Sequence, residues 1–341
     1  MKTVKIGING FGRIGRQAFK VALEHKEAEV VGINDLTSTA VLAHLLKYDS
    51  VYGRYHRKVE FDEANIIVDG KKYPVSAEKD PSLLPWGKLG VDVVIESTGR
   101  FTDSEKSSAH LKAGAKKVVI SAPAKDEGIT PTIVLGVNED KYKPDQKIIS
   151  NASCTTNCIA PVLAVMHEQF GVEKALMSTI HSYTAEQNLV DGPPPGGKSN
   201  DLRRARAAAV NIIPTTTGAA ISATQAIPEL KGKFDGVSFR VPTPVGSLSD
   251  FVILTKKNVT KDEVNNAFIK AAESTRFKGI LEVTSEPIVL ADIVANPASS
   301  IIDLSLTQVV DGNFVKVVSW YDNEFGYSHR LVEEVIMVGQ N

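Results

Sequence analysis

The run Val4-Lys-Ile-Gly-Ile-Asn-Gly-Phe-Gly-Arg-Ile-Gly-Arg16 begins with an apolar segment of strand length and continues into three glycines spaced G-x-G-x-x-G. Apolar residues recur at helical spacing in 16–24, and a second strand-like run, 30–33, ends at Asn34 and Asp35. This order predicts a strand, a tight turn, a helix and a second strand in succession.

Each glycine of this run has a distinct physical role. Gly10 permits the tight turn, Gly12 lets a pyrophosphate approach the backbone, and Gly15 lets the helix pack closely on the strand. The start of the helix then faces the phosphates. Asp35 is placed to accept both ribose hydroxyls of an adenosine and to repel a 2′-phosphate, so the pattern favours NAD over NADP. The alternative is a set of turn glycines with a surface aspartate.

The rest of the first half repeats the alternation of strands and helices. Apolar runs at 91–95, 117–120 and 132–135 predict strands, and 103–114 predicts a helix that stops at Gly114. The stretch 48–85 is less regular and predicts short additional strands or loops. A mostly parallel sheet with helices on both faces follows from this pattern.

The second half of the chain lacks the regular alternation of strands and helices. Residues 156–170 predict a helix that Pro161 either kinks or causes to start later, and 191–200 is too rich in proline and glycine for a helix or central strand. The remaining patterns predict strands at 176–180, 237–241, 251–254 and 314–319 and helices at 262–272 and 326–337. The fold class is therefore an α/β Rossmann NAD-binding domain, 1–153, plus an α+β catalytic domain with a mixed or antiparallel sheet, 154–323. A final helix at about 324–341 is expected to pack back on the first domain.

Bulk composition excludes several classes of protein. The chain has 341 residues, 43% of them hydrophobic, and a net charge of −1, which gives no electrostatic case for binding nucleic acid or an anionic membrane. No apolar run of about 18 residues predicts a membrane span, and the first residues lack a leader-like composition. Cys154 and Cys158 are the only cysteines, with no metal-type spacing around them, so we expect no metal site and a cytoplasmic location.

Cys154 is the main candidate for chemistry. It follows a strand-like run, 147–150, and precedes small hydroxyl residues and a helix start, where backbone N–H groups favour a thiolate. A small buried hydrophobe is the alternative interpretation. His181, at the end of the strand predicted at 176–180, is a candidate base.

Several motifs together resemble the family of phosphorylating glyceraldehyde-3-phosphate dehydrogenases over essentially the whole chain. The most specific are Ile8-Asn-Gly-Phe-Gly-Arg-Ile-Gly-Arg16, Ala152-Ser-Cys-Thr-Thr-Asn157 and His181-Ser-Tyr-Thr184. Others are Asp201-Leu-Arg-Arg-Ala-Arg206, Pro214-Thr-Thr-Thr-Gly-Ala-Ala220, Arg240-Val-Pro-Thr-Pro244 and Trp320-Tyr-Asp-Asn-Glu-Phe-Gly-Tyr-Ser328.

The resemblance implies an NAD-dependent oxidation of an aldehyde phosphate in the presence of inorganic phosphate. Cys154 would form a thiohemiacetal and then a thioester, with His181 as the base. Thr184 and Arg240 would hold the substrate phosphate. The residues implied for the attacking phosphate are Ser153, Thr155, Arg203, Thr217 and Gly218. Those implied for the cofactor are Gly10, Phe11, Gly12, Arg13, Ile14, Asp35, Lys79, Ser121 and Asn323.

The resemblance also implies a homotetramer, and the chain departs from the family pattern at three places. The loop around 192–197 is longer than usual, Glu186 stands where an aspartate is common, and 245–250 differs from the usual run.

Three other functions are alternatives to this expectation. An erythrose-4-phosphate dehydrogenase uses the same framework. A cysteine hydrolase would use Cys154 and His181 but not the glycine turn. The neutral net charge and the intact pair of Cys154 and His181 disfavour a catalytically silent binding module, for example one for RNA.

Overall fold

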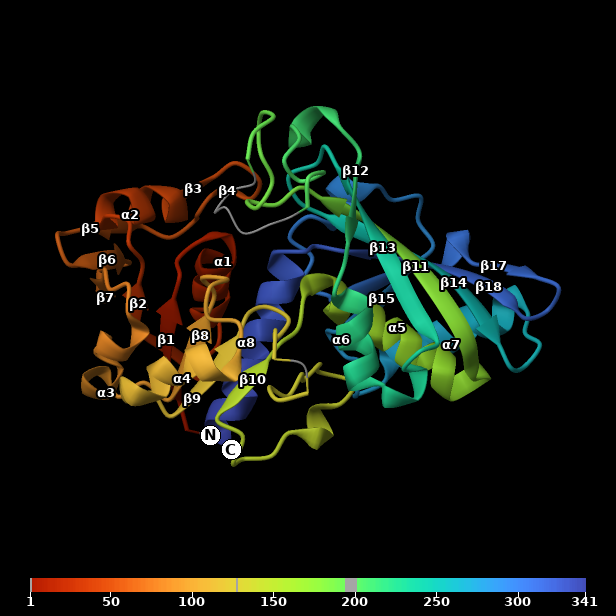
Figure 1. The fold of residues 1–341 in the computed structure, drawn as a ribbon, viewed down its shortest axis with the longest axis horizontal. Coiled ribbons are helices and arrows are strands. Elements are labelled where there is room, and N and C mark those ends of the chain that lie inside the picture. Colours follow the sequence, from red (N-terminus) through yellow and green to blue (C-terminus); the bar gives the residue numbers. More distant parts are fainter. Residues whose placement is uncertain (1, 127, 194–200) are drawn as a thin grey trace. The chain divides into compact units, whose positions relative to one another are not determined.

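The computed structural model describes residues 2–126, 128–193 and 201–341, and the chain divides into two compact units. Unit 1 comprises Met1–Ile133, Glu139–Ser153 and Ser328–Asn341, and unit 2 comprises Val134–Asn138 and Cys154–Tyr327. Figure 1 labels their helices and strands. From residue 194 on, the proline- and glycine-rich loop predicted at 191–200 lies outside the described residues.

Unit 1 is built on one sheet, which within the described residues has eight strands in the order β10-β9-β8-β1-β2-β7-β6-β5. The pairs from β10 to β7 are parallel, while β7, β6 and β5 pair antiparallel at one edge. The strands are β1 (Val4–Asn9), β2 (Ala28–Asn34), β5 (Val59–Phe61), β6 (Asn65–Val68), β7 (Lys71–Ser76), β8 (Val93–Glu96), β9 (Lys117–Ile120) and β10 (Ile148–Ser150). A separate pair is formed by β3 (Tyr48–Asp49) and β4 (Gly53–Arg54).

Helices follow β1 and β8, as the alternating pattern predicts, and others follow β2 and β7. They are α1 (Arg13–Ala22), α2 (Thr39–Lys47), α3 (Trp86–Leu89), α4 (Ser104–Lys112) and most of α8 (Phe325–Gln340). Helix α4 begins where the Asp103 side chain accepts a hydrogen bond from Lys106 N, and the chain turns away at Gly114, whose φ is +96°. Short 3-10 turns occur at Pro81–Leu83 and Glu139–Lys141. The predicted strand at 132–135 is wrong, because only an isolated bridge joins Thr132 to Ser150 and the chain then turns.

The indole of Trp86 is completely buried against the sheet of unit 1. A Cβ atom added at Gly7 of β1 would lie 3.1 Å from this ring, and one added at Gly32 of β2 would lie 3.2 Å from it. The two glycines therefore leave the space in which the indole packs directly on the strands, and Leu84, Val91 and Val94 complete the apolar cluster around it.

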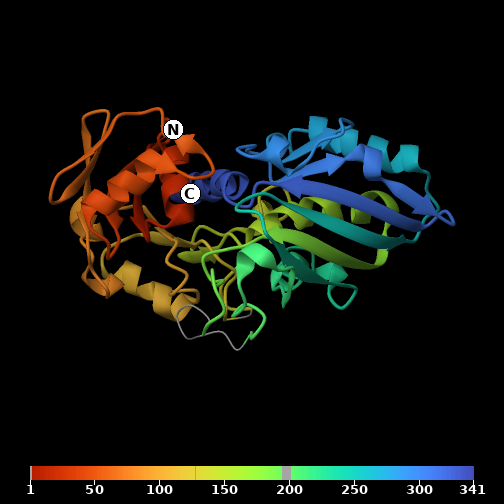
Figure 2. The ribbon, with the colours of Figure 1, turned by 90° about the horizontal axis from the view of Figure 1, so that it is seen from above.

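Unit 2 contains a second, mixed sheet, and within the described residues its strand order is β12-β13-β11-β14-β18-β16-β15, with β17 paired to β18. Most neighbours are antiparallel, but β11 pairs parallel with β13, and β15 with β16. The strands are β11 (Val172–Ser182), β12 (Ile213–Thr216), β13 (Phe234–Val241), β14 (Ser247–Thr255), β15 (Leu281–Thr284), β16 (Ser300–Asp303), β17 (Gln308–Val310) and β18 (Phe314–Tyr321). Figure 2 shows the long strands of this sheet side by side.

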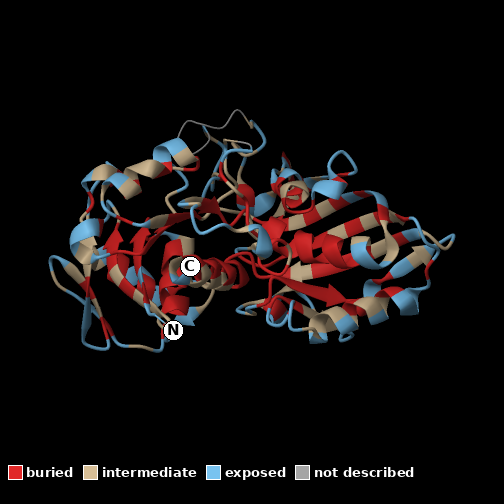
Figure 3. Ribbon diagram, turned by 90° about the horizontal axis from the view of Figure 1, so that it is seen from below, coloured by how far each residue is buried: buried red, intermediate tan, exposed pale blue. Residues whose placement is uncertain are grey.

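Three helices pack with this sheet: α5 (Cys154–Phe170), α6 (Ala219–Ala226) and α7 (Lys261–Glu273). Helix α5 begins at Cys154 and is continuous through Pro161, so Pro161 does not mark a later start of the helix. Almost every residue from 155 to 166 is buried, and this packing holds the helix together despite the lost backbone donor (Figure 3). Helix α7 starts with a capping box between Thr260 and Glu263. The 3-10 turns of this unit are Ala208–Val210, Pro228–Leu230, Leu290–Ile293 and Leu304–Leu306.

The chain therefore has the predicted fold class, a Rossmann-type α/β unit and an α+β unit with a mixed sheet. Among the described residues, we find no helix with the length and apolar character needed to cross a bilayer.

Glu334, on the part of α8 that belongs to unit 1, is fully buried. Neither carboxyl oxygen has a hydrogen-bond partner among the described residues, and burial raises the pKa of Glu334 well above its usual value. The folded chain thus keeps this carboxyl protonated at pH values where the unfolded chain has released the proton.

This difference makes folding depend on pH. Between the unfolded pKa and the raised folded pKa the folded state binds one more proton, so stability falls as the pH rises through this window, by at most about 1.4 kcal/mol per pH unit. We expect Glu334→Gln to lack this slope and to gain stability relative to the parent as the pH rises above about 5. Urea unfolding at several pH values measures the difference, with exposed Glu63→Gln as the control. Parallel pH profiles for parent and Glu334→Gln would contradict the expectation.

Candidate active site

Cys154 is the first residue of α5, directly after the turn that follows β10. Ala152 in this turn has a left-handed φ of 56°, which residues other than glycine rarely adopt. Burial raises the pKa of the Cys154 thiol, whereas the Arg240 guanidinium and the hydroxyl and amide of Thr155 lower it. The net pKa of the thiol is raised, although the helix start supplies donors that act in the direction of the thiolate.

His181 lies near the end of β11 and presents one ring nitrogen to this thiol. Its Nε2 is 3.5 Å from Cys154 Sγ, and its Nδ1 is 2.7 Å from the carbonyl oxygen of Ser182. A carbonyl only accepts, so Nδ1 carries the proton and Nε2 is free to accept one from the thiol. Burial and the Arg240 guanidinium lower the pKa of His181 to about 3, which keeps the resting imidazole neutral and able to act as a base.

The buried Tyr321 hydroxyl supports both members of this pair. It lies 2.9 Å from Thr155 Oγ1 at the start of α5 and 2.9 Å from Thr179 Oγ1 on β11. The Tyr321 ring also meets the His181 ring edge-on, with centroids 6.0 Å apart. One residue of β18 therefore connects the strand that carries the base to the helix that carries the thiol.

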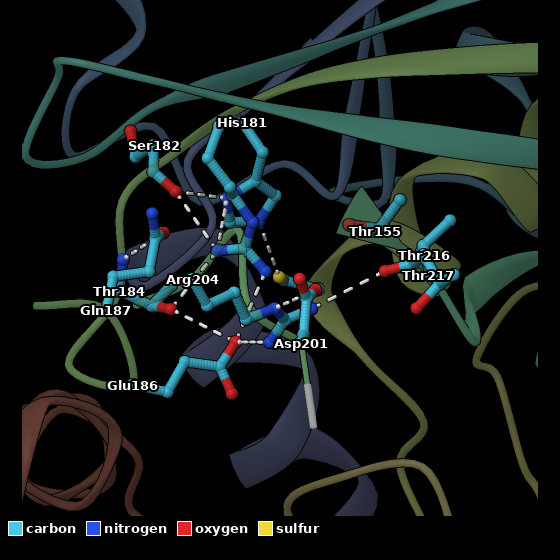
Figure 4. Close-up of polar contacts among 12 residues, drawn as sticks. Thr155, His181, Ser182, Thr184, Glu186, Gln187, Asp201, Arg204, Thr216 and Thr217 are labelled. Carbon is cyan, nitrogen blue, oxygen red and sulfur yellow. Dashed lines mark hydrogen bonds and ion pairs between the residues drawn. The ribbon is translucent and has the colours of Figure 1, made fainter. Parts of the chain in front are cut away.

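Next to His181 lies a cluster of charged side chains (Figure 4). Arg240 of β13 donates from Nη1 to the carbonyl oxygen of Ser182 and to Thr184 Oγ1, both at 3.1 Å. Its Nη2 is 3.5 Å from a carboxylate oxygen of Glu186, and the same oxygen accepts a hydrogen bond from Arg204. The cluster combines two guanidinium groups and a hydroxyl, the donor set that suits a phosphate.

Arg203, which is predicted to bind the attacking phosphate, and its neighbour Arg204 lie in different environments. Arg204 has a side chain only 17% exposed, and its Nη2 is 3.5 Å from the carbonyl oxygen of Thr216. Arg203 is exposed, and its backbone N–H donates to Asp201. The structure therefore brings Arg204, rather than the predicted Arg203, to Glu186 and Arg240.

Thr217 and Gly218 precede helix α6, whose start lies beside that of α5. Thr156 Oγ1 of α5 is 3.4 Å from the carbonyl oxygen of Ala219, and Thr217 Oγ1 accepts from Ala219 N. A Cβ added at Gly218 would meet nothing within 4 Å, so the backbone here is accessible to a ligand. Thr155 lies at the start of α5 as well. Ser153 immediately precedes Cys154 and is the last residue of the segment Glu139–Ser153 of unit 1.

In unit 1, the glycine turn has the geometry that its sequence predicts. Gly10 has a φ of +94°, and a Cβ at Gly15 would lie 2.0 Å from the carbonyl oxygen of Gly10, so no side chain fits where helix meets turn. A Cβ at Gly12 would meet nothing within 4 Å, which leaves the backbone open to a pyrophosphate. Ile14 is the second residue of α1, and Arg13 is paired with Asp49 at 2.7 Å.

A pocket of about 520 Å³ lies between this turn and the ends of β2 and β8. Asp35 lines it, and its two carboxylate oxygens accept from Phe11 N at 2.8 Å and from Thr37 N at 3.0 Å. Each oxygen keeps a further lone pair for a ribose hydroxyl. Lys79 also lines the pocket. These residues fit the adenosine part of a dinucleotide.

Ser121 and Asn323, the other predicted cofactor residues, lie in different units. Ser121 follows β9 and its N–H donates to the carbonyl oxygen of Glu96. Asn323 follows β18 and its Oδ1 accepts from Gly246 N at 2.8 Å, which fixes the amide orientation and leaves Nδ2 as the donor. Across the described ranges, no group of three or more His, Cys, Asp or Glu side chains has a geometry that could hold a metal ion.

Comparison with known proteins decides the family. The family profile for the glyceraldehyde 3-phosphate dehydrogenase NAD binding domain matches residues 4–104, and that for the C-terminal domain matches 153–323. Glyceraldehyde-3-phosphate dehydrogenase of Streptomyces coelicolor is 55% identical over 339 residues, 99% of both chains. The enzyme of Geobacillus stearothermophilus is 56% identical over 331 residues, 97% of this chain and 96% of its own.

The chain belongs to the glyceraldehyde-3-phosphate dehydrogenase family. The resemblance seen in the motifs is thereby confirmed, and with it an NAD-dependent enzyme and NAD as its cofactor. The glycine turn and Asp35 lie inside the matched NAD-binding domain.

Two residues of the candidate site did not emerge from the sequence. Tyr321 stands within a family-like motif, but no local pattern marks a tyrosine whose hydrogen-bond partner is 166 positions away. Arg204 was visible, but three arginines in four positions do not show which one turns inward.

We expect Asp35→Asn to shift cofactor preference toward NADP. The change removes the charge that would repel a 2′-phosphate while keeping the shape of the side chain. A change of about tenfold in the ratio of kcat/KM for NADP to that for NAD corresponds to about 1.4 kcal/mol. Steady-state kinetics with both cofactors measures it. Asp140→Asn, the same charge change at an exposed position, serves as control. An unchanged ratio would show that Asp35 does not recognise the ribose.

We also expect His181→Asn to slow alkylation of Cys154 by iodoacetamide at pH 7 by about tenfold or more. Without Nε2 the thiol loses the proton acceptor that lies 3.5 Å from Sγ. Mass spectrometry of the alkylated peptide measures the rate, and exposed His56→Asn is the matched control. Equal rates in His181→Asn and the parent would exclude His181 as the proton acceptor.

Proposed function

We propose that this chain oxidises D-glyceraldehyde 3-phosphate with NAD and inorganic phosphate to 1,3-bisphosphoglycerate, a step of glycolysis and gluconeogenesis. The observation that carries the proposal is the contact of Cys154 Sγ with the unprotonated Nε2 of His181 at the start of a helix. Family membership and the two arginines beside this pair support it.

In the first step, the Cys154 sulfur attacks the aldehyde carbon. His181 Nε2 takes the thiol proton and returns it to the former carbonyl oxygen, which gives a thiohemiacetal. Nε2 then removes the hydroxyl proton as a hydride leaves the same carbon and a thioester forms. Bound NAD supplies the acceptor for that hydride. Attack by phosphate on the thioester breaks the C–S bond and releases the acyl phosphate and the Cys154 thiolate.

Two phosphate groups need positions around this pair. Thr184 and Arg240 are assigned to the substrate phosphate, since Arg240 already donates to Thr184 Oγ1. For the attacking phosphate we assign Ser153, Thr155, Thr217 and Gly218 at the starts of α5 and α6, with Arg204 in place of the predicted Arg203. The Arg204 side chain, which is only 17% exposed and lies near Thr216, supports this exchange.

The residues assigned to the cofactor follow from the pocket of unit 1 and from the orientation of Asn323. Asp35 would bind the adenosine ribose, and the backbone of Gly10 to Ile14 would face the pyrophosphate. Lys79 would lie at the adenine side, and Ser121 at the nicotinamide side. Asn323 Nδ2 would donate to the carboxamide of the nicotinamide.

The assay is NADH formation from glyceraldehyde 3-phosphate, NAD and phosphate. We expect the parent to be active and Cys154→Ser to lose more than about 10³-fold in kcat. Cys158→Ser is the matched control, because Cys158 is fully buried and hydrogen-bonded to Ser319, so it should stay within about threefold of the parent. An active Cys154→Ser enzyme would contradict the mechanism.

The same assay with erythrose 4-phosphate separates the nearest alternative. The glyceraldehyde substrate is expected to give the larger kcat/KM and to require phosphate. A larger value with erythrose 4-phosphate would assign the chain to the other reaction. A cysteine hydrolase is disfavoured by the NAD-binding domain, and an RNA-binding role by the paired Cys154 and His181.

A homotetramer is proposed as the working assembly. The sheet of unit 2 carries an apolar pocket of about 570 Å³ in which Leu176 is 64% exposed and Phe314 48% exposed, an unusual surface for a monomer. Light scattering is expected to give about four times the chain mass of 36.8 kDa, and a monomer mass would exclude the assembly.

A cytoplasmic location is proposed as well. Both Cys154 and Cys158 are free thiols, which suits a reducing compartment.

A further inference from the structure

A line of buried polar side chains lies beneath the cofactor pocket of unit 1. It consists of Trp86, His110, Glu96, Asn9 and Asn34, each between 0% and 4% exposed. Of these, only Asn9 and Asn34 line the pocket itself. Burying so many polar groups is costly unless each is hydrogen-bonded, so their bonds must be accounted for one by one.

The direction of the first bonds is set by Trp86. An indole N–H only donates, and Trp86 Nε1 is 3.0 Å from His110 Nδ1, so Nδ1 is the acceptor. The proton of the neutral imidazole is then on Nε2, which donates to Glu96 Oε2 at 2.9 Å. Trp86 thereby fixes both the tautomer of His110 and the direction of its bond to the carboxylate.

Glu96, at the end of β8, connects His110 to one wall of the pocket through hydrogen bonds. Its Oε2 also accepts from Asn9 Nδ2, and its Oε1 accepts from both the amide and the hydroxyl of Thr98, the amide at 2.8 Å. Thr98 Oγ1 in turn accepts from Arg100 N at 3.1 Å. Thr98 and Arg100 line the pocket. The turn after β8 is therefore held in place by the Glu96 carboxylate, which accepts hydrogen bonds from four donors.

Asn9 and Asn34 connect the same carboxylate to the opposite wall. Asn34 Nδ2 donates to Asn9 Oδ1 at 2.7 Å and to the carbonyl oxygen of Glu78 at 2.9 Å. Asn34 Oδ1 accepts from Glu78 N at 2.9 Å. Glu78 and Lys79 form that wall, and their backbone is therefore tied through the two asparagines to Glu96.

The line of buried polar side chains ends at Trp86, which is rigidly packed. The Trp86 ring packs where Gly7 and Gly32 leave space, and Gly87 N donates to the carbonyl oxygen of Ala113 just after α4, the helix that carries His110. Neither end of the Trp86–His110 bond can shift without repacking this core.

We propose that His110 is a positioning residue for the adenosine half of NAD. By donating to Glu96 in one fixed direction, it holds the two walls of the pocket at the spacing that the ligand requires, without touching the ligand. The proposal rests on NAD occupying this pocket, but not on the identity of the aldehyde.

The test compares three substitutions at this position by equilibrium titration with NAD and with ADP-ribose, which lacks the nicotinamide. His110→Leu removes both ring nitrogens. His110→Asn keeps an amide near the position of Nδ1 and loses the donor to Glu96, whereas His110→Gln places an amide donor near Nε2. Exposed His44→Leu is the matched control.

We expect the dissociation constants of both ligands to rise about tenfold in His110→Leu and His110→Asn and to stay within about threefold of the parent in His110→Gln and His44→Leu. In steady-state kinetics KM for NAD should rise in the first two, with kcat and KM for the aldehyde within about twofold. If His110→Leu does not fold, the comparison of His110→Asn with His110→Gln decides.

Parental affinity in His110→Asn, or equal weakening in the asparagine and glutamine variants, would overturn the proposal. A uniform fall of kcat without a change in KM for NAD would assign His110 a purely structural role and would also overturn it. A parent that binds neither ligand would instead contradict the proposed function, so the two failures are distinguishable.

Discussion

The contact between the Cys154 thiol and His181 Nε2 is possible only because the surrounding structure offsets the cost of burying two ionisable groups. Burial alone raises the pKa of the thiol and lowers that of the imidazole, so it opposes charge on both. Arg240 and the donors at the start of α5 act on the thiol in the opposite direction. The helix start, the end of β11 and the end of β13 must therefore meet at one point.

The two units position their functional residues with different kinds of sheet. In unit 1, parallel strands end at a common edge, where the glycine turn and Asp35 form one continuous pocket. In unit 2, β11 lies between a parallel neighbour and an antiparallel one, so His181 of β11 and Arg240 of β13 become direct register partners. A mixed sheet brings together a base and a cation that the sequence separates by 59 positions.

Features that depend on a few neighbouring residues were predictable from the sequence. The glycine turn, Asp35 at a strand end and Cys154 at a helix start are local patterns, and each is found where it was expected. Whether Arg203 or Arg204 turns inward depends on the rotation of an irregular segment, which has no period to reveal it. The segment at 132–135 is apolar because it is buried, and burial alone does not make a strand. Contacts such as those of Tyr321 arise only from tertiary packing.

Glu186 gives the charged cluster a property that its arginines alone would lack. In the ligand-free chain its carboxylate occupies the place between Arg204 and Arg240 that an anion would otherwise take. A phosphate that binds either arginine, as proposed, would therefore replace one anion by another. Such an exchange would lower the affinity but speed departure, because the leaving phosphate would not leave an unneutralised cation behind. For an enzyme whose substrate and product both carry this phosphate, rapid release matters as much as tight capture.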